Sequence, residues 1–204
     1  MKLSIQYLQK AIDNNSPNVK EMTGNVARTL IEQIDHLSKI AADFSQFANI
    51  GNPRKEMFDL HDLLYSLTSL YKSTENVIFK WNPVPQRVML FADKTQLNRL
   101  FTNLLQNAIE APENKTTRIV ELDESLEGEF IIVNIRDNGG GIPENMREKI
   151  FAPNFTTKSS GTGLGLAMSK SIAEQALGDI WFETIEGEGT VFHVKLPLVR
   201  AVDY

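Results

Sequence analysis

The sequence contains no cysteine among its 204 residues. This absence excludes disulfides and thiolate zinc sites, and nothing in the chain points to an oxidising compartment. The three histidines, His36, His61 and His193, fall in different predicted elements, which is not the spacing of a metal site. No apolar run approaches the roughly 18–20 residues that a membrane-spanning helix needs, and no signal peptide is visible. The chain is expected to be cytoplasmic, with any membrane anchor confined to a parent segment outside it.

Positive charge is also scarce. The chain has 21 Lys and Arg against 26 Asp and Glu, a net charge of −5 and a pI of about 5.3. No cluster of basic residues appears either, so the electrostatics argue against a nucleic-acid partner. Hydrophobic residues make up 42% and charged residues 23%, which is typical of an ordinary globular protein.

Glycine and proline are rare in the first 50 residues, which hold one of each. Apolar residues recur there at steps of three or four, in a short stripe and then in a longer one. The stripes are Met1, Ile5, Leu8 and Ile12, and then Val19, Met22, Val26, Leu30, Ile34, Leu37, Ala41, Phe44 and Ala48. Two such helices form a hairpin that cannot bury its seams alone. Pairing of two hairpins into a four-helix bundle is favoured over packing against the downstream residues.

From residue 55 short strands alternate with amphipathic helices. The expected strands are Met57–Leu60, a pair at Val77–Trp81 and Arg87–Phe91, then Arg118–Leu122, Phe130–Ile135, Ile180–Thr184 and Val191–Leu196. The expected helices carry Leu63 to Leu70, Gln96 to Ala111 (capped by Asp93 or Thr95 and stopped by Pro112), and Leu164 to Leu177 with Gly178 just past its end. The pattern predicts an α+β fold, a two-layer sandwich of a mixed sheet with helices on one face.

Three segments carry candidate chemistry. Asn103 and Asn107 lie four positions apart, so both amides project from one face of a predicted helix, although solvated surface amides would look the same. Asp137 ends a predicted strand and precedes three consecutive glycines, which are costly in chain entropy unless the backbone must approach something closely. Gly161 to Leu166 forms a glycine-rich loop at a helix N-terminus, which suits phosphate but is a weak signal alone.

The order and spacing of these segments resemble the ATP-binding fold shared by histidine kinases, DNA gyrase, the chaperone Hsp90 and the mismatch-repair protein MutL. Residues 103–111 match the N box of histidine kinases, 137–141 the first glycine box, 151–158 the F box and 161–166 the second glycine box. The resemblance covers residues 55–198, and the first part of the chain resembles the NtrB/NtrY-like, nitrogen-regulation group. One departure is Asn154, where the F box often has a second aromatic residue.

The resemblance implies a role for each box. Asp137 would accept the adenine amino group, Asn107 would bind Mg²⁺ through its amide oxygen, and Asn103 would lie near the phosphates with Lys158. Residues 143–160 would form a lid over ATP. The implied catalytic residues are Asn103 and Lys158, and the implied nucleotide-binding residues are Asn103, Asn107, Asp137, Gly139, Gly141, Ile142, Phe151, Thr157, Lys158, Gly161, Thr162, Gly163, Leu164, Gly165, Leu166 and Thr190.

The resemblance also implies how the chain divides and acts. Residues 1–52 would be a truncated helical hairpin through which the protein forms a homodimer, and residues 53–204 the ATP-binding catalytic domain. The γ-phosphoryl group would pass to a histidine of the hairpin and then to an aspartate of a response-regulator receiver domain. The acceptor segment of relatives would lie upstream of this chain, so the chain is not expected to phosphorylate itself.

Two alternatives differ in class. A stand-alone serine kinase or slow ATPase of the same fold is disfavoured, because ATP-hydrolysing relatives carry a general-base Glu where this chain has Asn103, and an amide cannot take that proton. A non-catalytic dimerisation scaffold is disfavoured because a decayed site is expected to lose its costly glycines first.

Overall fold

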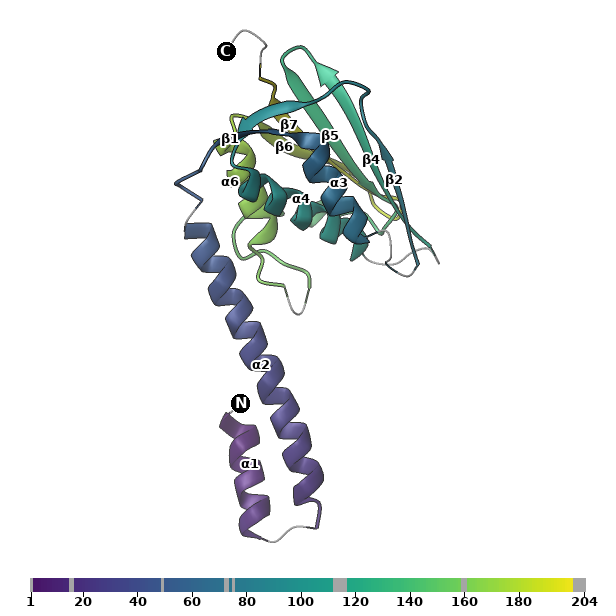
Figure 1. The fold of residues 1–204 in the computed structure, drawn as a ribbon. Helices are drawn as coiled ribbons and strands as arrows, with labels where there is room; N and C mark the ends of the chain where they lie inside the picture. Colours follow the sequence, from purple (N-terminus) through teal and green to yellow (C-terminus); the bar gives the residue numbers. More distant parts are fainter. Residues whose placement is uncertain are drawn as a thin grey trace.

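A computed structural model describes residues 2–14, 17–48, 50–71, 74, 76–111, 117–158 and 161–199. The side chains of six helical residues, Lys2, His36, Lys39, Asp43, Phe47 and Ala48, are outside that description. Figure 1 shows a helical hairpin at the N-terminus that extends away from an α/β body formed by the rest of the chain. The predicted combination of hairpin and α+β fold is confirmed.

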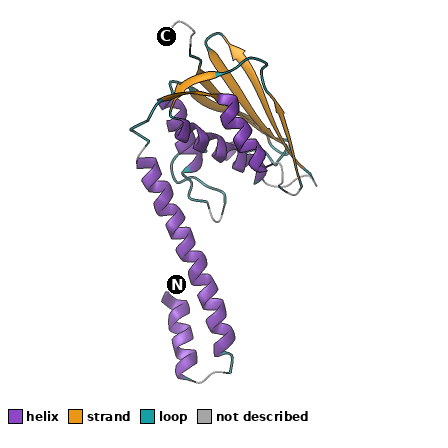
Figure 2. Ribbon diagram, viewed as in Figure 1, coloured by secondary structure: helices purple, strands orange, loops and turns teal. Residues whose placement is uncertain are grey.

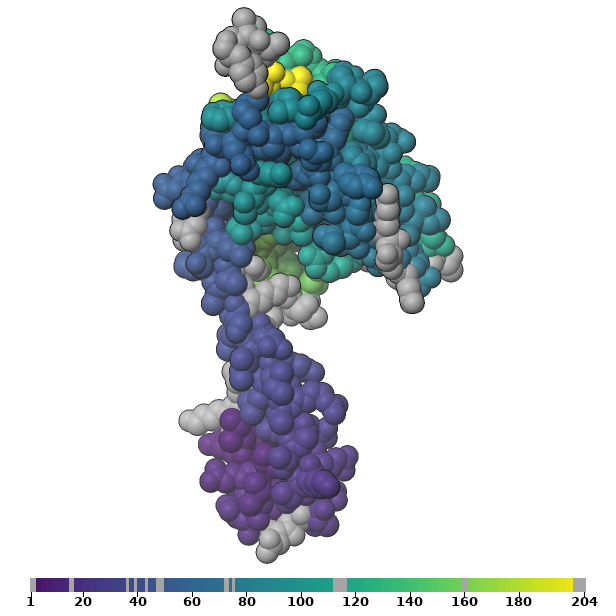
Figure 3. Space-filling view, in the orientation of Figure 1, coloured from purple at the N-terminus to yellow at the C-terminus, as the bar shows by residue number. Residues whose placement is uncertain are grey.

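The hairpin consists of α1 (Lys2–Asp13) and the much longer α2 (Val19–Ala48). Because α1 is shorter, it lies beside only the first part of α2, as Figure 1 shows. The first part of the predicted stripe, Val19 to Leu30, is therefore half-buried, whereas Ile34, Leu37 and Phe44 are exposed. In the space-filling view of Figure 3 the hairpin is a separate lobe. No helix within the described ranges is long and apolar enough to cross a membrane.

The body is built on a five-stranded sheet with the order β2-β4-β5-β7-β6. The strands are β2 (Val77–Asn82), β4 (Arg118–Glu127), β5 (Phe130–Asp137), β6 (Asp179–Ile185) and β7 (Gly189–Pro197). Only β2 and β4 run parallel, and the other neighbours are antiparallel, so the sheet is mixed as predicted. A separate two-stranded ribbon pairs β1 (Glu56–Asp59) with β3 (Met89–Ala92).

Three helices, α3 (Leu60–Tyr71), α4 (Lys94–Ile109) and α6 (Gly165–Gln175), lie on one side of the large sheet, as Figure 2 shows. The short α5 (Glu144–Arg147) lies in the connection between β5 and α6. The core fills the space between the layers, with Leu100, Phe101 and Leu104 of α4 fully buried against Val133 and Ile135 of β5. Burying this apolar surface is the main stabilising contribution to the body.

Strand pairing and the ends of several elements differ from the sequence-based expectations. The helix expected over residues 96–111 spans Lys94–Ile109, and the strand expected over residues 87–91 spans Met89–Ala92. The runs around residues 77–82 and 89–92 are both strands, but they do not pair with each other, because β2 joins the large sheet and β3 joins β1. The helix expected to reach Leu177 ends at Gln175, and Leu177 itself takes a left-handed conformation with φ of 61°. Gly178 does not supply the left-handed residue but allows close packing against β7, since a Cβ there would lie 2.0 Å from the carbonyl oxygen of Lys195.

Candidate functional site

Helix α4 carries the two predicted amides on a face directed toward the loop before α6. Its N-cap is Asp93, whose Oδ1 accepts the N–H of Gln96 at 2.9 Å, so of the two predicted caps it is Asp93 that the helix uses. Nδ2 of Asn103 donates to the carbonyl oxygen of Gly165 at 3.2 Å. The amide face of α4 is thereby tied to the first residue of α6.

Lys158 reaches the same face from the F-box segment. Its Nζ donates to Oδ1 of Asn107 at 3.0 Å and to Oε2 of Glu110 at 2.7 Å. The amide oxygen assigned to Mg²⁺ by the resemblance therefore already accepts a cationic group in this structure. Asn103, Asn107, Lys158 and Gly165 form one connected group of predicted site residues, which we call the amide cluster.

Asp137 ends β5 and is 6% exposed. Burial raises the pKa of its carboxyl group above the ordinary value of 3.8, while the backbone N–H groups of Gly139 and Thr190 and the charge of Arg118 oppose that rise. Oδ1 of Asp137 accepts the Gly139 N–H at 2.8 Å. A buried carboxylate held in this way accepts a ligand N–H group strongly, because few competing water molecules reach it.

The glycines after Asp137 allow the backbone to lie against the β6–β7 hairpin. Gly141 has a φ of 70°, and a Cβ there would lie 2.4 Å from the carbonyl oxygen of Ile185. The Gly187 N–H donates to the Gly140 carbonyl at 2.8 Å, and the Ile142 N–H donates to Oγ1 of Thr184 at 2.9 Å. The Thr184 hydroxyl also lies 3.1 Å from that of Thr190. Asp137, Gly139, Gly141, Ile142 and Thr190 are therefore brought together, and we call them the carboxylate cluster.

Arg118, at the start of β4, lies between the C-terminal end of α4 and Asp137, and no sequence-based prediction singled it out. Its guanidinium donates to the carbonyl oxygens of Ala108 and Ala111 at the C-terminal end of α4, and it is buried. Its charge also acts on Asp137. A cation at the negative end of a helix dipole is stabilising. No local signal marks this residue, because a lone Arg at the start of a strand has no recognisable motif.

The second glycine box leads into α6 without a side-chain cap. Leu164 is the N-cap residue and makes no side-chain capping hydrogen bond, so its side chain does not occupy the first N–H groups of α6. Gly163 has a φ of 68°, and a Cβ there would lie 2.6 Å from the carbonyl carbon of Asn154. Asn154 also has a positive φ, 64°, which Asn tolerates better than an aromatic residue does. The departure from the F box thus fits the local backbone.

The remaining predicted residues lie around these clusters. Phe151 packs in an aromatic group, with ring centroids 6.1 Å from Phe182 and 6.4 Å from Phe192. Leu164 is buried and Leu166 is half-buried against the core. Thr157 is exposed, and Gly161 and Thr162 are half-buried. Thr157 is thus the predicted site residue least embedded in the structure.

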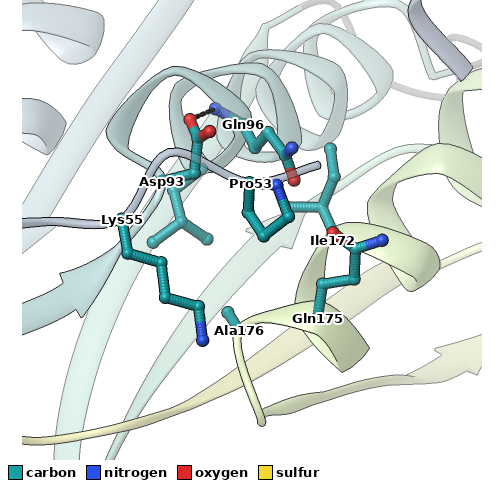
Figure 4. A pocket seen from close by; sticks show the side chains of 8 residues that line it. Pro53, Lys55, Asp93, Gln96, Ile172, Gln175 and Ala176 are labelled. Atoms are coloured by element: carbon teal, nitrogen blue, oxygen red, sulfur yellow. Dashed lines mark hydrogen bonds between the residues drawn. The ribbon is translucent and has the colours of Figure 1, made fainter. Parts of the chain in front are cut away.

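A separate pocket lies away from both clusters, where the segment after α2 meets α4 and α6. Figure 4 shows Pro53 and Lys55 of that segment facing Asp93 and Gln96 of the α4 end and Gln175 of α6. No residue of the amide or carboxylate cluster lines this pocket. Here the Arg54 N–H donates to Oδ2 of Asp93 at 2.7 Å, and Nε2 of Gln96 donates to the Ile50 carbonyl at 3.2 Å. The pocket therefore marks the attachment of α2 to the N-terminal end of α4.

The sequence of this chain is similar to a known protein family and to individual curated proteins. The profile of a family described as histidine kinase-, DNA gyrase B- and HSP90-like ATPase matches residues 92–200. The chain is 31% identical to the sensor histidine kinase ZraS of Salmonella typhi over 201 residues, which is 96% of this chain and 42% of that protein. It is 26% identical to the nitrogen regulation protein NtrY of Azorhizobium caulinodans over 202 residues, 96% of this chain and 26% of that protein.

A solved structure shares the fold. The catalytic domain of the histidine kinase ThkA is 32% identical, has a TM-score of 0.63, and the match covers 71% of this chain and 95% of that one. The chain spans less than half the length of the two curated relatives named above. The similarity to ThkA concerns a catalytic domain alone, whereas the similarity to ZraS and NtrY extends over almost all of this chain.

Proposed function

This chain belongs to the histidine kinase-, DNA gyrase B- and HSP90-like ATPase family, and we propose that it is the ATP-binding catalytic domain of a sensor histidine kinase together with part of its helical hairpin. One observation carries the proposal. The buried carboxylate of Asp137, the glycines behind it and the amide face of α4 stand in the order and on the elements that the family resemblance requires. The domain boundary that we propose lies between residues 52 and 53.

The carboxylate cluster is proposed to select adenine. The ionised carboxylate of Asp137 accepts hydrogen bonds only, so it attracts the amino group of adenine and repels the carbonyl oxygen that guanine carries at the same place. Thr190 donates its backbone N–H to this carboxylate and thereby fixes its orientation. Gly141 lets the loop after Asp137 lie directly against the β6–β7 hairpin, because any Cβ would collide with the backbone there.

The amide cluster is proposed to hold the phosphate end of ATP. Oδ1 of Asn107 already contacts the ammonium group of Lys158, so a hard oxygen atom faces a cation there, which fits Mg²⁺. When bound, Mg²⁺ would neutralise charge on the transferring phosphoryl group. Lys158 supplies a positive charge beside it, and the uncapped N–H groups of α6 supply further donors to phosphate oxygens.

Phosphoryl transfer, rather than hydrolysis, is the proposed reaction. Asn103 donates through its amide to Gly165, and an amide at this position cannot act as the general base that activates water. The acceptor is proposed to be a histidine on a helical hairpin of the dimer, with later relay to a response-regulator receiver domain. The exposed stripe of α2, including Ile34, Leu37 and Phe44, supports pairing of two hairpins, because an apolar face of this length is stabilised by a partner.

The experiment supplies a separate acceptor. The chain is mixed with γ-labelled ATP, Mg²⁺ and the acceptor hairpin of a related sensor kinase, and the products are analysed for acid-labile phosphohistidine. We expect label on the hairpin with wild type and none with Asn107→Ala. Rapid steady-state phosphate release without labelled hairpin would instead identify a stand-alone ATPase.

A further inference from the structure

Lys158 and Glu110 form an ion pair beside the proposed metal ligand. The pair joins the F-box segment to the end of α4, with 2.7 Å between Nζ and Oε2 and side-chain exposures of 37% and 43%. The same ammonium lies 3.0 Å from Oδ1 of Asn107. One cation is thus shared between the amide proposed to bind Mg²⁺ and a carboxylate to which the family resemblance assigns no role.

Glu110 occupies an unusual place for a carboxylate. It is the C-cap residue of α4, at the negative end of the helix dipole, where an anion is destabilising. Its other oxygen, Oε1, accepts a hydrogen bond from Nε2 of Gln106 at 2.8 Å, which orients the carboxylate. The position is thus unfavourable for α4 by itself, and the contact with Lys158 offsets part of that cost.

We propose that Glu110 is a positioning residue that latches Lys158 onto the amide face of α4 until Mg-ATP arrives. The proposal rests on the proposed function, because it assumes that Mg-ATP binds at this face. The ammonium of Lys158 holds the Asn107 oxygen in the nucleotide-free chain. Mg-ATP replaces that cation at Asn107, and its phosphates then attract Lys158 away from Glu110.

The latch makes two demands on the bound state. The Lys158–Glu110 contact must break, so nucleotide binding is weakened by the free energy of the pair. Exposed ion pairs of this kind correspond to a change of about two- to five-fold in an equilibrium constant. Glu110 also lies near the proposed phosphate site, so its negative charge could weaken ATP binding by repelling phosphate directly. The latch requires in addition that the effect of removing this charge on ATP affinity depends on Lys158.

A carbodiimide that joins a carboxylate directly to an amine tests the contact. Peptide mapping by mass spectrometry measures the Glu110–Lys158 cross-link in the full chain with and without saturating Mg-ATP. We expect a clear cross-link in the nucleotide-free chain and at least a three-fold lower yield with Mg-ATP. The Lys80–Glu121 pair, with 2.6 Å between Nζ and Oε1, is the internal control and should not change. An absent cross-link, or one that saturating Mg-ATP leaves unchanged, overturns the latch.

Calorimetric titration of ATP with Mg²⁺ into four proteins separates the latch from simple repulsion. These are wild type, Glu110→Gln, Lys158→Gln and the double variant. A fifth protein, Glu148→Gln, controls for loss of an exposed negative charge in the connection that carries Lys158. Glu110→Gln should tighten binding about two- to five-fold when Lys158 is present and distinctly less in the Lys158→Gln background. Equal effects in both backgrounds would contradict the latch while leaving the proposed function intact, whereas absence of ATP binding to wild type would remove both.

Discussion

The hairpin and the α/β body use the same kind of amphipathic helix with opposite outcomes. The apolar stripe of α4 is fully covered, and Leu97, Leu100 and Phe101 are inaccessible to solvent. The stripe of α2 is covered only where α1 lies beside it, and Ile34 remains 57% exposed. Periodicity therefore predicts a helix and its apolar face, but not the layer that covers that face. The sheet covers the stripe of α4, and we propose that a second copy of the hairpin covers the stripe of α2.

This difference implies two sources of stability within one chain. The body buries its own core and is expected to unfold as an independent cooperative unit. The hairpin has little core of its own, so its stability should depend on protein concentration if it pairs with a second copy.

The largest contrast is expected from truncation of one apolar side chain in each region. Phe101→Ala leaves a cavity in the fully buried core of the body and should lower the free energy of unfolding by about 3–5 kcal/mol. Ile34→Ala should change the unfolding of the body by less than about 0.5 kcal/mol. Urea denaturation followed by tryptophan fluorescence measures both, since Trp81 and Trp181 lie in the body.

Sedimentation velocity completes that comparison for the hairpin. Ile34→Ala should weaken any concentration-dependent dimer, whereas a conservative change of an exposed body residue, Leu177→Ala, should not. Equal loss of body stability from Phe101→Ala and Ile34→Ala would show that the stripe of α2 packs on its own body in solution.

Glycine replacements should have opposite signs in the two regions. Gly141→Ala forces a side chain into a left-handed backbone position and against the Ile185 carbonyl, so it should cost about 1–3 kcal/mol and reduce ATP binding. Gly24 lies within α2, and a methyl group added there would meet no atom within 4 Å, so Gly24→Ala should stabilise that helix by about 0.5–1 kcal/mol. Circular dichroism melts of both variants measure the two effects, and destabilisation by Gly24→Ala would contradict the open position of this residue.

Removing the carboxylate of Asp93, at the junction between the hairpin and the body, should cause an intermediate loss of stability. Asp93 caps α4 through Oδ1 and accepts the Arg54 N–H through Oδ2, so Asp93→Ala removes two contacts at once. We expect a loss of about 0.5–2 kcal/mol in thermal or chemical unfolding. Asp93→Asn keeps one acceptor oxygen and should lose less. An unchanged stability for Asp93→Ala would mean that the attachment of α2 does not depend on this carboxylate.

The smallest effect is a dependence on pH. The folded state raises the pKa of Asp137 through burial, so its contribution to stability is fully present below the ordinary value of 3.8 and is lost as pH rises through the raised value. The affinity for ATP should have the opposite pH dependence, because the adenine amino group needs the ionised carboxylate. The affinity is therefore expected to fall as pH drops through the raised pKa. ATP titrations at several acidic pH values measure this, and Asp137→Asn should remove the dependence. An unchanged affinity across that range would contradict the assignment of Asp137.

The pKa of Asp59 is shifted in the opposite direction to that of Asp137, which gives an internal comparison. Burial alone would raise its pKa, but Arg87 and the His61 N–H outweigh that and leave it below 3.8. Its contribution to stability is therefore present above 3.8 and is lost as pH falls through the lowered pKa.

Family membership and fold class could be predicted from the sequence, because the glycine boxes and the strand spacings are local features. Both predictions are confirmed. The roles of Asn103, Asn107 and Asp137 stay predictions. The pairing of β1 with β3, the capping of α4 by Arg118 and the contact of Glu110 with Lys158 were not predicted. Each joins residues far apart in the chain or depends on how a loop returns, and no local pattern encodes such contacts.

Calorimetric titration of ATP and GTP into wild type and Asp137→Asn tests the adenine site most directly. We expect that wild type binds ATP in preference to GTP, that Mg²⁺ strengthens the binding, and that Asp137→Asn loses most of the affinity for ATP while the fold is retained by circular dichroism. Failure of folded wild type to bind ATP, or equal binding of ATP by Asp137→Asn, would contradict the assignment of the carboxylate cluster as the adenine site.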